Sequence, residues 1–157
     1  NVQVGRGTFS LKIIDLERKI NINLADQAIL TRALTVMGVD FSMQTPIVNS
    51  ILDWKDTDDF TLTDGTESDY YMSLSPPYMS KNGPLDEISE LLLIRGITEQ
   101  PAIYWGASAT NVMVMPAMSG PSTRLRGEEM VAYPVGLKDL FTTINQGRVN
   151  VNTASPE

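Results

Sequence analysis

The residues best suited to chemistry are the carboxylates of an acidic stretch, residues 53–69. Seven of its seventeen side chains are Asp or Glu, and a single lysine lies among them. Carboxylate oxygens bind hard cations such as calcium, and alternate side chains of a loop can converge on one ion. A run of charges is also typical of a solvated loop. The residues alone leave both interpretations open; the candidate ligands are Asp56, Asp58, Asp64, Glu67 and Asp69.

The spacing of these carboxylates resembles a cation site without matching the best-known calcium loop. Asp56 and Asp58 form a D-x-D pair, and further carboxylates follow Gly65, where a glycine lets the backbone turn sharply. The register differs from that of an EF-hand, which we therefore exclude. The stretch is followed by Tyr70 and Tyr71, which we expect to pack the loop against the core, because aromatic side chains bury a large area.

The composition excludes several other kinds of site. The chain has 157 residues with no cysteine and no histidine. It therefore lacks a thiol nucleophile, the usual general base at neutral pH and the commonest transition-metal ligand. We find no GxSxG, Walker or GxGxxG motif and expect no enzymatic activity, although a carboxylate pair facing one substrate would suit a hydrolase. The net charge of −7 disfavours nucleic-acid binding, because an acidic surface repels phosphate.

Helices must position the acidic stretch. Apolar residues at helical spacing predict one helix that is capped by Asn23 and ends at Gly38. A second helix is predicted to begin at Thr45-Pro46 and to lead into the acidic stretch. The same periodicity predicts further helices over residues 86–95, 99–104 and 136–144.

Short strands are predicted near both ends of the chain. Alternating apolar residues predict a hairpin within residues 5–23, and the pattern of residues 19–23 recurs at 148–152. If these two segments pair, residues 1–23 and 146–157 supply a sheet and residues 24–145 form a helical insertion between its strands. Within that insertion, residues 106–135 have no helical period and are predicted to be irregular, with a short strand near Val112.

One segment suggests an alternative function. Residues 90–97, ELLLIRGI, look like half of a helix-hairpin-helix DNA-binding motif, and VNVNTASPE at the end of the chain resembles the lead-in to such a motif. A second hairpin helix is not evident after Gly96, and the local charge is acidic. A DNA-binding module is therefore kept as the alternative that electrostatics disfavours.

Taken in order, several segments resemble one family. They are GRG-x-F, KININ, DW-x-D-x-D, G-x-E-x-DYY, PPY, KN-x-PL, ELLL-x-RGIT, GL-x-DLFT and G-x-VNVNTASPE. Their order and spacing are similar to those of the minor pseudopilin K family of the bacterial type II secretion system. The resemblance covers most of the chain and is weakest over residues 106–135.

The resemblance implies a fold and a function. The fold is α+β and predominantly helical, with a SAM-like helical domain inserted between strands of a small antiparallel pilin-type sheet. The function is that of a structural subunit that assembles with minor pseudopilins I and J at the tip of the pseudopilus and caps it. Such proteins are anchored in the inner membrane and have periplasmic bodies.

The resemblance also implies calcium as the cation of the acidic stretch. The family's D-x-D and G-x-E-x-D segments correspond here to Asp56, Asp58, Glu67 and Asp69, and we add Asp64 from its place beside them. Because the chain starts with Asn and ends on a helix start, we expect it to be a fragment that lacks the family's N-terminal membrane helix.

Overall fold

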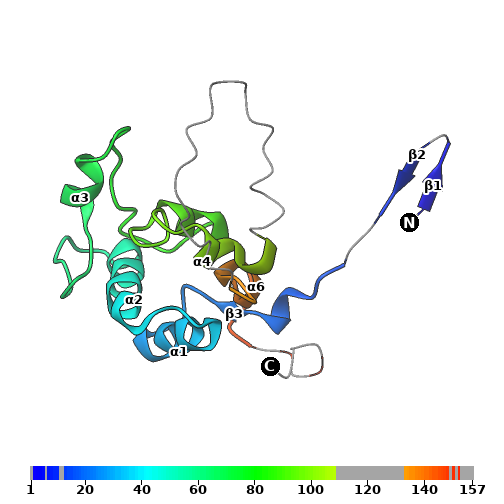
Figure 1. Ribbon diagram of the computed structural model, residues 1–157, viewed down its shortest axis with the longest axis horizontal. Coiled ribbons are helices and arrows are strands. Elements are labelled where there is room, and N and C mark those ends of the chain that lie inside the picture. Colours follow the sequence, from blue (N-terminus) through cyan, green and yellow to red (C-terminus); the bar gives the residue numbers. More distant parts are fainter. Residues whose placement is uncertain are drawn as a thin grey trace, which may run out of the picture.

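The computed structural model describes residues 2–5, 7–10, 13–108, 133–148, 150 and 152. These residues form a mixed structure of helices and short strands, in which α1 packs against α2 and α4 against α6 (Figure 1). The irregular segment and the strand predicted near Val112 fall largely outside them. The elements are β1 (Val2–Val4), β2 (Gly7–Phe9), η1 (Leu16–Arg18), β3 (Ile20–Asn21), α1 (Gln27–Met37), α2 (Phe41–Lys55), α3 (Ser68–Met72), η2 (Ile88–Leu93), α4 (Ala102–Trp105), η3 (Gly106–Ser108), α6 (Leu137–Leu140) and β4 (Phe141–Thr142).

The first helix ends where the sequence predicts but begins later. Gly38 ends α1 in the left-handed conformation, with a φ of 81°. At the other end, the Asp26 carboxylate accepts a hydrogen bond from the Ile29 N–H at 2.9 Å and caps the first turn. The predicted cap at Asn23 is wrong, because its side chain instead forms two hydrogen bonds with the backbone of Leu85, at 2.8 and 2.9 Å.

The second helix begins one turn earlier than predicted. The Asp40 carboxylate accepts a hydrogen bond from the Ser42 N–H at 2.9 Å, so α2 starts at Phe41 and the predicted start at Thr45-Pro46 is wrong. Pro46 lies inside the helix. α2 then runs to Lys55, so that Asp53 occupies its last turn and Asp56 follows its end.

The helices predicted over residues 86–95 and 99–104 are both shorter in the structure. The first is a 3-10 helix, η2, and the second is the α-helical turn α4. Gly96 lies between them with a φ of 84°, which favours glycine. α4 therefore follows Gly96 and overlaps the helix predicted over residues 99–104.

Gly96 should tolerate alanine less well than Gly38. Both glycines have positive φ, which costs an alanine about 1–2 kcal/mol. A Cβ at Gly96 would also lie 2.6 Å from Cγ1 of Ile47, whereas nothing lies within 4 Å of a Cβ at Gly38. Overpacking adds about 1–3 kcal/mol, so Gly96→Ala should lower the free energy of unfolding more than Gly38→Ala does. Urea unfolding measures both, and equal losses would contradict this packing.

The strand pairing near the core is parallel, so the predicted antiparallel pairing of the two chain ends is wrong for β3. Ile20 pairs with Phe141, and Asn21 with Thr142. The helix predicted over 136–144 ends at Leu140, because the chain becomes extended at Phe141 and the Thr142 carbonyl accepts from the Ile22 N–H at 2.9 Å. Val149 and Val151 of the predicted strand 148–152 lie outside the described residues.

The N-terminal hairpin also differs from the prediction. β1 and β2 pair antiparallel, and Gly5, with a φ of 59°, lies in the turn between them. The predicted turn at residues 15–19 forms η1 instead, because the Asp15 carboxylate caps it by accepting from the Glu17 N–H at 2.9 Å. The SAM-like topology of the helical region and its status as an insertion stay predictions.

A single cluster of buried side chains holds the helical elements together. It draws on α1, α2, η2, α4, α6 and the segment around β3 and β4. Its largest fully buried side chains include Tyr71, Phe141, Ile22, Leu30, Leu34, Met37, Ile47, Ile51, Leu91, Ile94, Ile97 and Ile103.

Candidate metal centre

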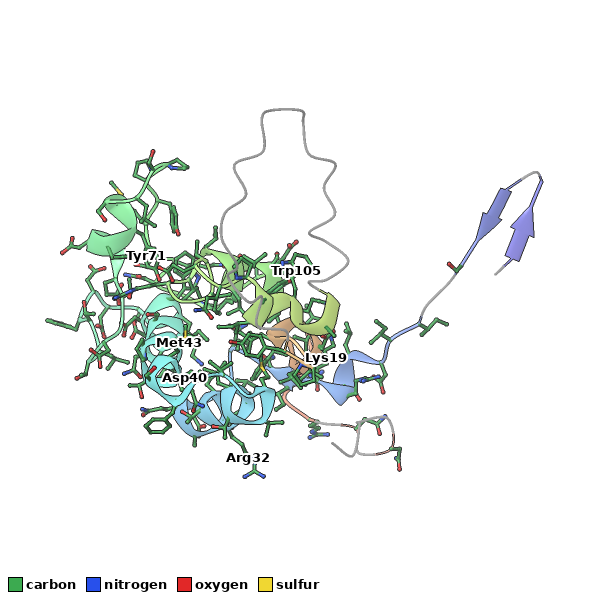
Figure 2. The ribbon with its side chains drawn as sticks, viewed as in Figure 1. Lys19, Arg32, Asp40, Met43, Tyr71 and Trp105 are labelled. Carbon is green, nitrogen blue, oxygen red and sulfur yellow. The ribbon has the colours of Figure 1, made fainter. Side chains whose placement is uncertain are left out.

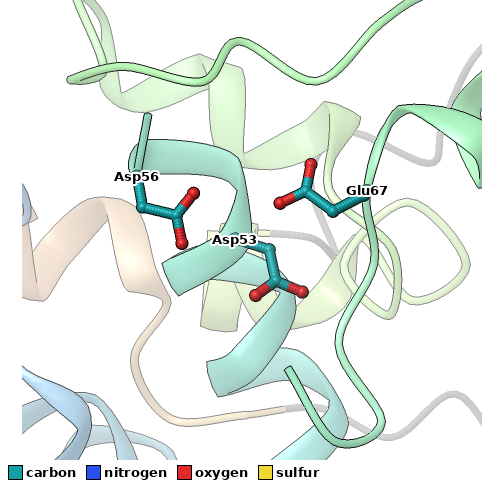
Figure 3. A group of neighbouring side chains, drawn as sticks. All are labelled: Asp53, Asp56 and Glu67. Atoms are coloured by element: carbon teal, nitrogen blue, oxygen red, sulfur yellow. The ribbon is translucent and has the colours of Figure 1, made fainter. Parts of the chain in front are cut away.

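Three carboxylates meet where α2 ends and α3 begins. Asp53 lies in the last turn of α2, Asp56 directly follows that helix, and Glu67 directly precedes α3. One carboxylate oxygen from each lies within 4.8 Å of the others. In Figure 3 the carboxylates of Asp56 and Glu67 point toward each other, whereas that of Asp53 points away from the space between them.

A buried polar face of α2 positions the loop that carries Glu67. Asn49, Ser50 and Asp53 are spaced to share one side of the helix, and all three are buried. The Asn49 amide donates to the Thr63 carbonyl at 2.7 Å, and the Ser50 hydroxyl donates to Oγ1 of Thr66 at 3.0 Å. These bonds attach residues 62–66 to the helix along its length.

Asp53 accepts the shortest of the hydrogen bonds between α2 and this loop. It is 0 % exposed, and its Oδ2 accepts from the Thr66 N–H at 2.6 Å. Both of its oxygens also lie within 3.3 Å of the Leu62 nitrogen, whose N–H they accept. The carboxylate therefore satisfies backbone donors of a loop that has no ladder of its own.

Two buried oxygens of the cluster lack a protein donor. Asp56 Oδ1 and Glu67 Oε1 have no hydrogen-bond partner among the described residues, and Glu67 is 5 % exposed. Buried polar atoms are normally hydrogen-bonded, because an unsatisfied one costs about 1–3 kcal/mol. A species that can approach two carboxylates at once would satisfy both oxygens.

The other oxygen of Glu67 lies in a group of atoms that is short of protons. The Ser80 hydroxyl oxygen lies 2.9 Å from Glu67 Oε2, 2.6 Å from Asn82 Oδ1 and 2.6 Å from the Ser68 hydroxyl. Two hydroxyls carry two protons, and three contacts need three. The group is therefore one donor short, and a proton on Glu67 Oε2 would supply it.

Burial makes all three carboxylates harder to ionise. Desolvation is the largest cause of a raised pKa for Asp53, Asp56 and Glu67, and the neighbouring carboxylates raise each further. Hydrogen bonds act in the opposite direction but do not cancel burial, even for Asp53 with its backbone donors. Clustered carboxylates of this kind become stable as anions when a cation neutralises them.

The donor set fits a hard divalent cation. Every side chain in the cluster offers oxygen, and calcium prefers carboxylate, carbonyl and hydroxyl oxygens over nitrogen or sulfur. The unpartnered oxygens of Asp56 and Glu67 supply the direct contacts that such an ion requires. The chain has no cysteine or histidine that would favour a softer metal.

The structure brings together two of the five carboxylates predicted from the sequence. Asp56 and Glu67 belong to the cluster, and Asp58, Asp64 and Asp69 do not. These last three are exposed, and the Asp58 carboxylate accepts from the Phe60 N–H at 2.9 Å.

Asp53 belongs to the cluster but was not among the predicted residues. A signal for it exists in the sequence, because it follows Asn49 by four residues and Ser50 by three. Polar residues at that spacing share one face of a helix.

The aromatic residues that follow the acidic stretch pack against the core, as predicted. Tyr71 is 0 % exposed, and Figure 2 labels it on α3. Its ring stacks on Tyr78 at 5.2 Å and meets Trp54 edge-on at 5.1 Å. Tyr70 is partly buried against the same cluster. These rings join α3 to the end of α2, next to the carboxylates.

In the connection between η2 and α4, the Gly96 N–H is not free to bind a phosphate. In DNA-binding hairpins the glycine amide meets phosphate, but here the Gly96 N–H donates to the Glu99 carboxylate. Oε1 of Glu99 in turn accepts from the Tyr70 hydroxyl at 2.9 Å. A nucleic acid would have to displace a carboxylate of the protein itself, and the DNA-binding alternative gains no support.

Comparisons with known proteins point to one family. The family model described as type II secretion system, protein K, matches residues 9–103. The type II secretion system protein K of Klebsiella pneumoniae is 30 % identical over 107 residues, which are 60 % of this chain and 33 % of that protein. The putative protein K of Escherichia coli K12 is 42 % identical over 62 residues, 40 % of this chain and 19 % of that protein.

A solved structure is also similar. It is described as the crystal structure of the GspK–GspI–GspJ complex from the enterotoxigenic Escherichia coli type 2 secretion system. The match has a TM-score of 0.47 and 24 % identity, and covers 52 % of this chain and 33 % of that one.

The extent of these matches defines what they show. The chain spans about a third of the length of the Klebsiella relative. Separately, no helix in the described residues is both long and apolar enough to cross a membrane. The family model, however, covers more than half of the chain, from residue 9 to residue 103. This chain belongs to the type II secretion system protein K family.

Proposed function

We propose that this chain is part of a non-enzymatic structural subunit of the type II secretion pseudopilus. The observation that carries the proposal is the family match over residues 9–103, which includes α1, α2, α3, η2 and the acidic stretch. The subunit assembles with minor pseudopilins I and J at the tip, on the periplasmic side of the inner membrane. Its helical region projects beyond the pilin-type sheet and blocks the addition of a further subunit.

The carboxylate cluster stabilises that helical region by binding calcium. Asp56 and Glu67 lie eleven residues apart in the sequence, so an ion between them closes the loop that connects α2 to α3. Two oxygens without donors, three raised carboxyl pKa values and an oxygen-only donor set support a hard cation. Asp58, Asp64 and Asp69 stay predicted ligands that lie outside this cluster.

Assembly with the sister subunits tests the structural role. The full-length protein, expressed with the I and J subunits of the same secretion system, should elute with both from size-exclusion chromatography as one complex. A major subunit of the same pseudopilus, expressed in place of I and J, serves as the control and should not co-elute. Separate elution of the protein from I and J would contradict the proposed place at the tip.

A further inference from the structure

Asp53 differs from the other two carboxylates in what its oxygens contact. Both of its oxygens accept backbone N–H groups of the loop, from Leu62 and Thr66. Asp56 and Glu67 each keep a buried oxygen with no partner among the described residues. Figure 3 agrees, since the Asp53 carboxylate is the one directed away from the space between the other two.

Gly65 makes this attachment possible. A Cβ at Gly65 would lie 2.0 Å from Asp53 Oδ2 and 3.0 Å from its Cγ. Real Cβ atoms do not approach other atoms to 2.0 Å, so any side chain at residue 65 would displace the carboxylate. The φ of Gly65 is not in the left-handed region, and close approach, not backbone conformation, therefore requires glycine here.

The attachment determines where Glu67 lies. Thr66, which Asp53 holds by its N–H, directly precedes Glu67, and Thr66 is itself 2 % exposed. We propose that Asp53 is a positioning residue: it fixes the loop backbone on α2 and so holds Glu67 opposite Asp56 for the cation. This role rests on the proposed cation site, but the bonds that carry it exist without an ion.

The sharpest test changes no carboxylate at all. Gly65→Ala should weaken calcium binding by about 10- to 100-fold with an unchanged number of ions, because it displaces a residue that supports the ligands. Gly83→Ala is the matched control, since the nearest atom to its Cβ would be 3.8 Å away. Isothermal titration calorimetry measures both. Equal calcium affinity in the two variants would overturn the positioning role.

Asp53→Asn separates a positioning residue from a ligand even if Gly65→Ala fails to fold. Its amide would turn a donor toward the Leu62 or Thr66 N–H, so the unfolding temperature in EDTA should fall below that of the wild type. The unfolding temperature of Glu67→Gln in EDTA should not fall below that of the wild type, because this substitution removes repulsion between carboxylates. An Asp53→Asn variant that matches or exceeds the wild type in EDTA would overturn the proposal. A wild type that binds no calcium would instead overturn the proposed cation site, and leaves the EDTA comparison to decide the role of Asp53.

Discussion

Calcium should raise the unfolding temperature of this protein by about 5–10 °C when it is present at about 100 times its Kd. At that concentration a single site adds about 2.7 kcal/mol to the free energy of unfolding. In a chain of this size each kcal/mol corresponds to about 2–4 °C. The gain is expected because the ion satisfies two buried oxygens that have no partner among the described residues. Thermal unfolding in calcium and in EDTA measures it.

Substitution of the two oxygen donors should abolish this gain. The double variant Asp56→Asn/Glu67→Gln should melt at the same temperature in calcium and in EDTA. In EDTA it should melt no lower than the wild type, because it removes two acids whose pKa values are raised, first by burial and then by neighbouring carboxylates.

The exposed carboxylates of the same loop provide the control. Asp69→Asn and Asp64→Asn remove side chains that lie outside the cluster, and both variants should keep the full calcium shift. A double variant that keeps the shift, or an Asp69→Asn variant that loses it, would contradict the geometry and favour the wider ligand set predicted from the sequence.

The calcium shift should also grow with pH. Without the ion, the raised pKa values of Asp56 and Glu67 mean that the folded protein binds protons more tightly than the unfolded chain does. Their contribution to stability is therefore fully present below the unfolded values, about 4. It is lost as the pH rises through the folded values. Calcium binds the ionised forms and opposes this loss, so the shift should be small near pH 4 and larger at pH 7. A shift independent of pH over this range would argue against binding by these carboxylates.

Removal of the Tyr71 ring should destabilise the protein more than any change to the acidic loop. Tyr71 is 0 % exposed and contacts Trp54, Tyr70 and Tyr78. Truncating a buried aromatic residue costs about 3–5 kcal/mol, because the cavity that remains does not fully collapse. Tyr71→Ala should therefore lower the free energy of unfolding by that amount, measured by urea unfolding in EDTA.

Phe60 supplies the control for this substitution. It is an aromatic residue of the loop between α2 and α3, but it is 84 % exposed. Phe60→Ala should change the free energy of unfolding by no more than about 0.5 kcal/mol. Similar effects of Tyr71→Ala and Phe60→Ala would show that the aromatic residues do not attach the loop to the core.

Local signals in the sequence predicted glycines with positive φ, because a single residue determines this feature. Gly38 ends α1 with positive φ, as its place after an apolar periodic segment indicated. Gly96 also has positive φ, but it follows the end of η2 at Leu93 by three residues. Helix starts were less predictable because several short polar residues compete for each cap. Asp26 caps α1 in place of Asn23, because the Asn23 side chain hydrogen-bonds to the backbone of Leu85, sixty-two residues away. No local pattern contains that contact.

Pairing between distant segments escaped prediction for the same reason. Residues 19–23 and 148–152 look alike, but similarity of pattern does not determine which strands pair. Phe141 pairs with Ile20 because the chain leaves its helix after Leu140, one turn before the apolar period ends. The family resemblance was confirmed, and of the predicted ligands Asp56 and Glu67 lie in the carboxylate cluster. Asp53 was missed because its burial depends on the loop that folds over it.

Diffraction from crystals grown with calcium tests the central claim most directly. We predict one anomalous difference peak at about 2.3–2.6 Å from the unpartnered oxygens of Asp56 and Glu67, the usual calcium–oxygen distance. Asp53 should still accept the N–H groups of Leu62 and Thr66 in those crystals. The absence of an anomalous peak between Asp56 and Glu67, with water or a shared proton on their oxygens instead, would contradict it.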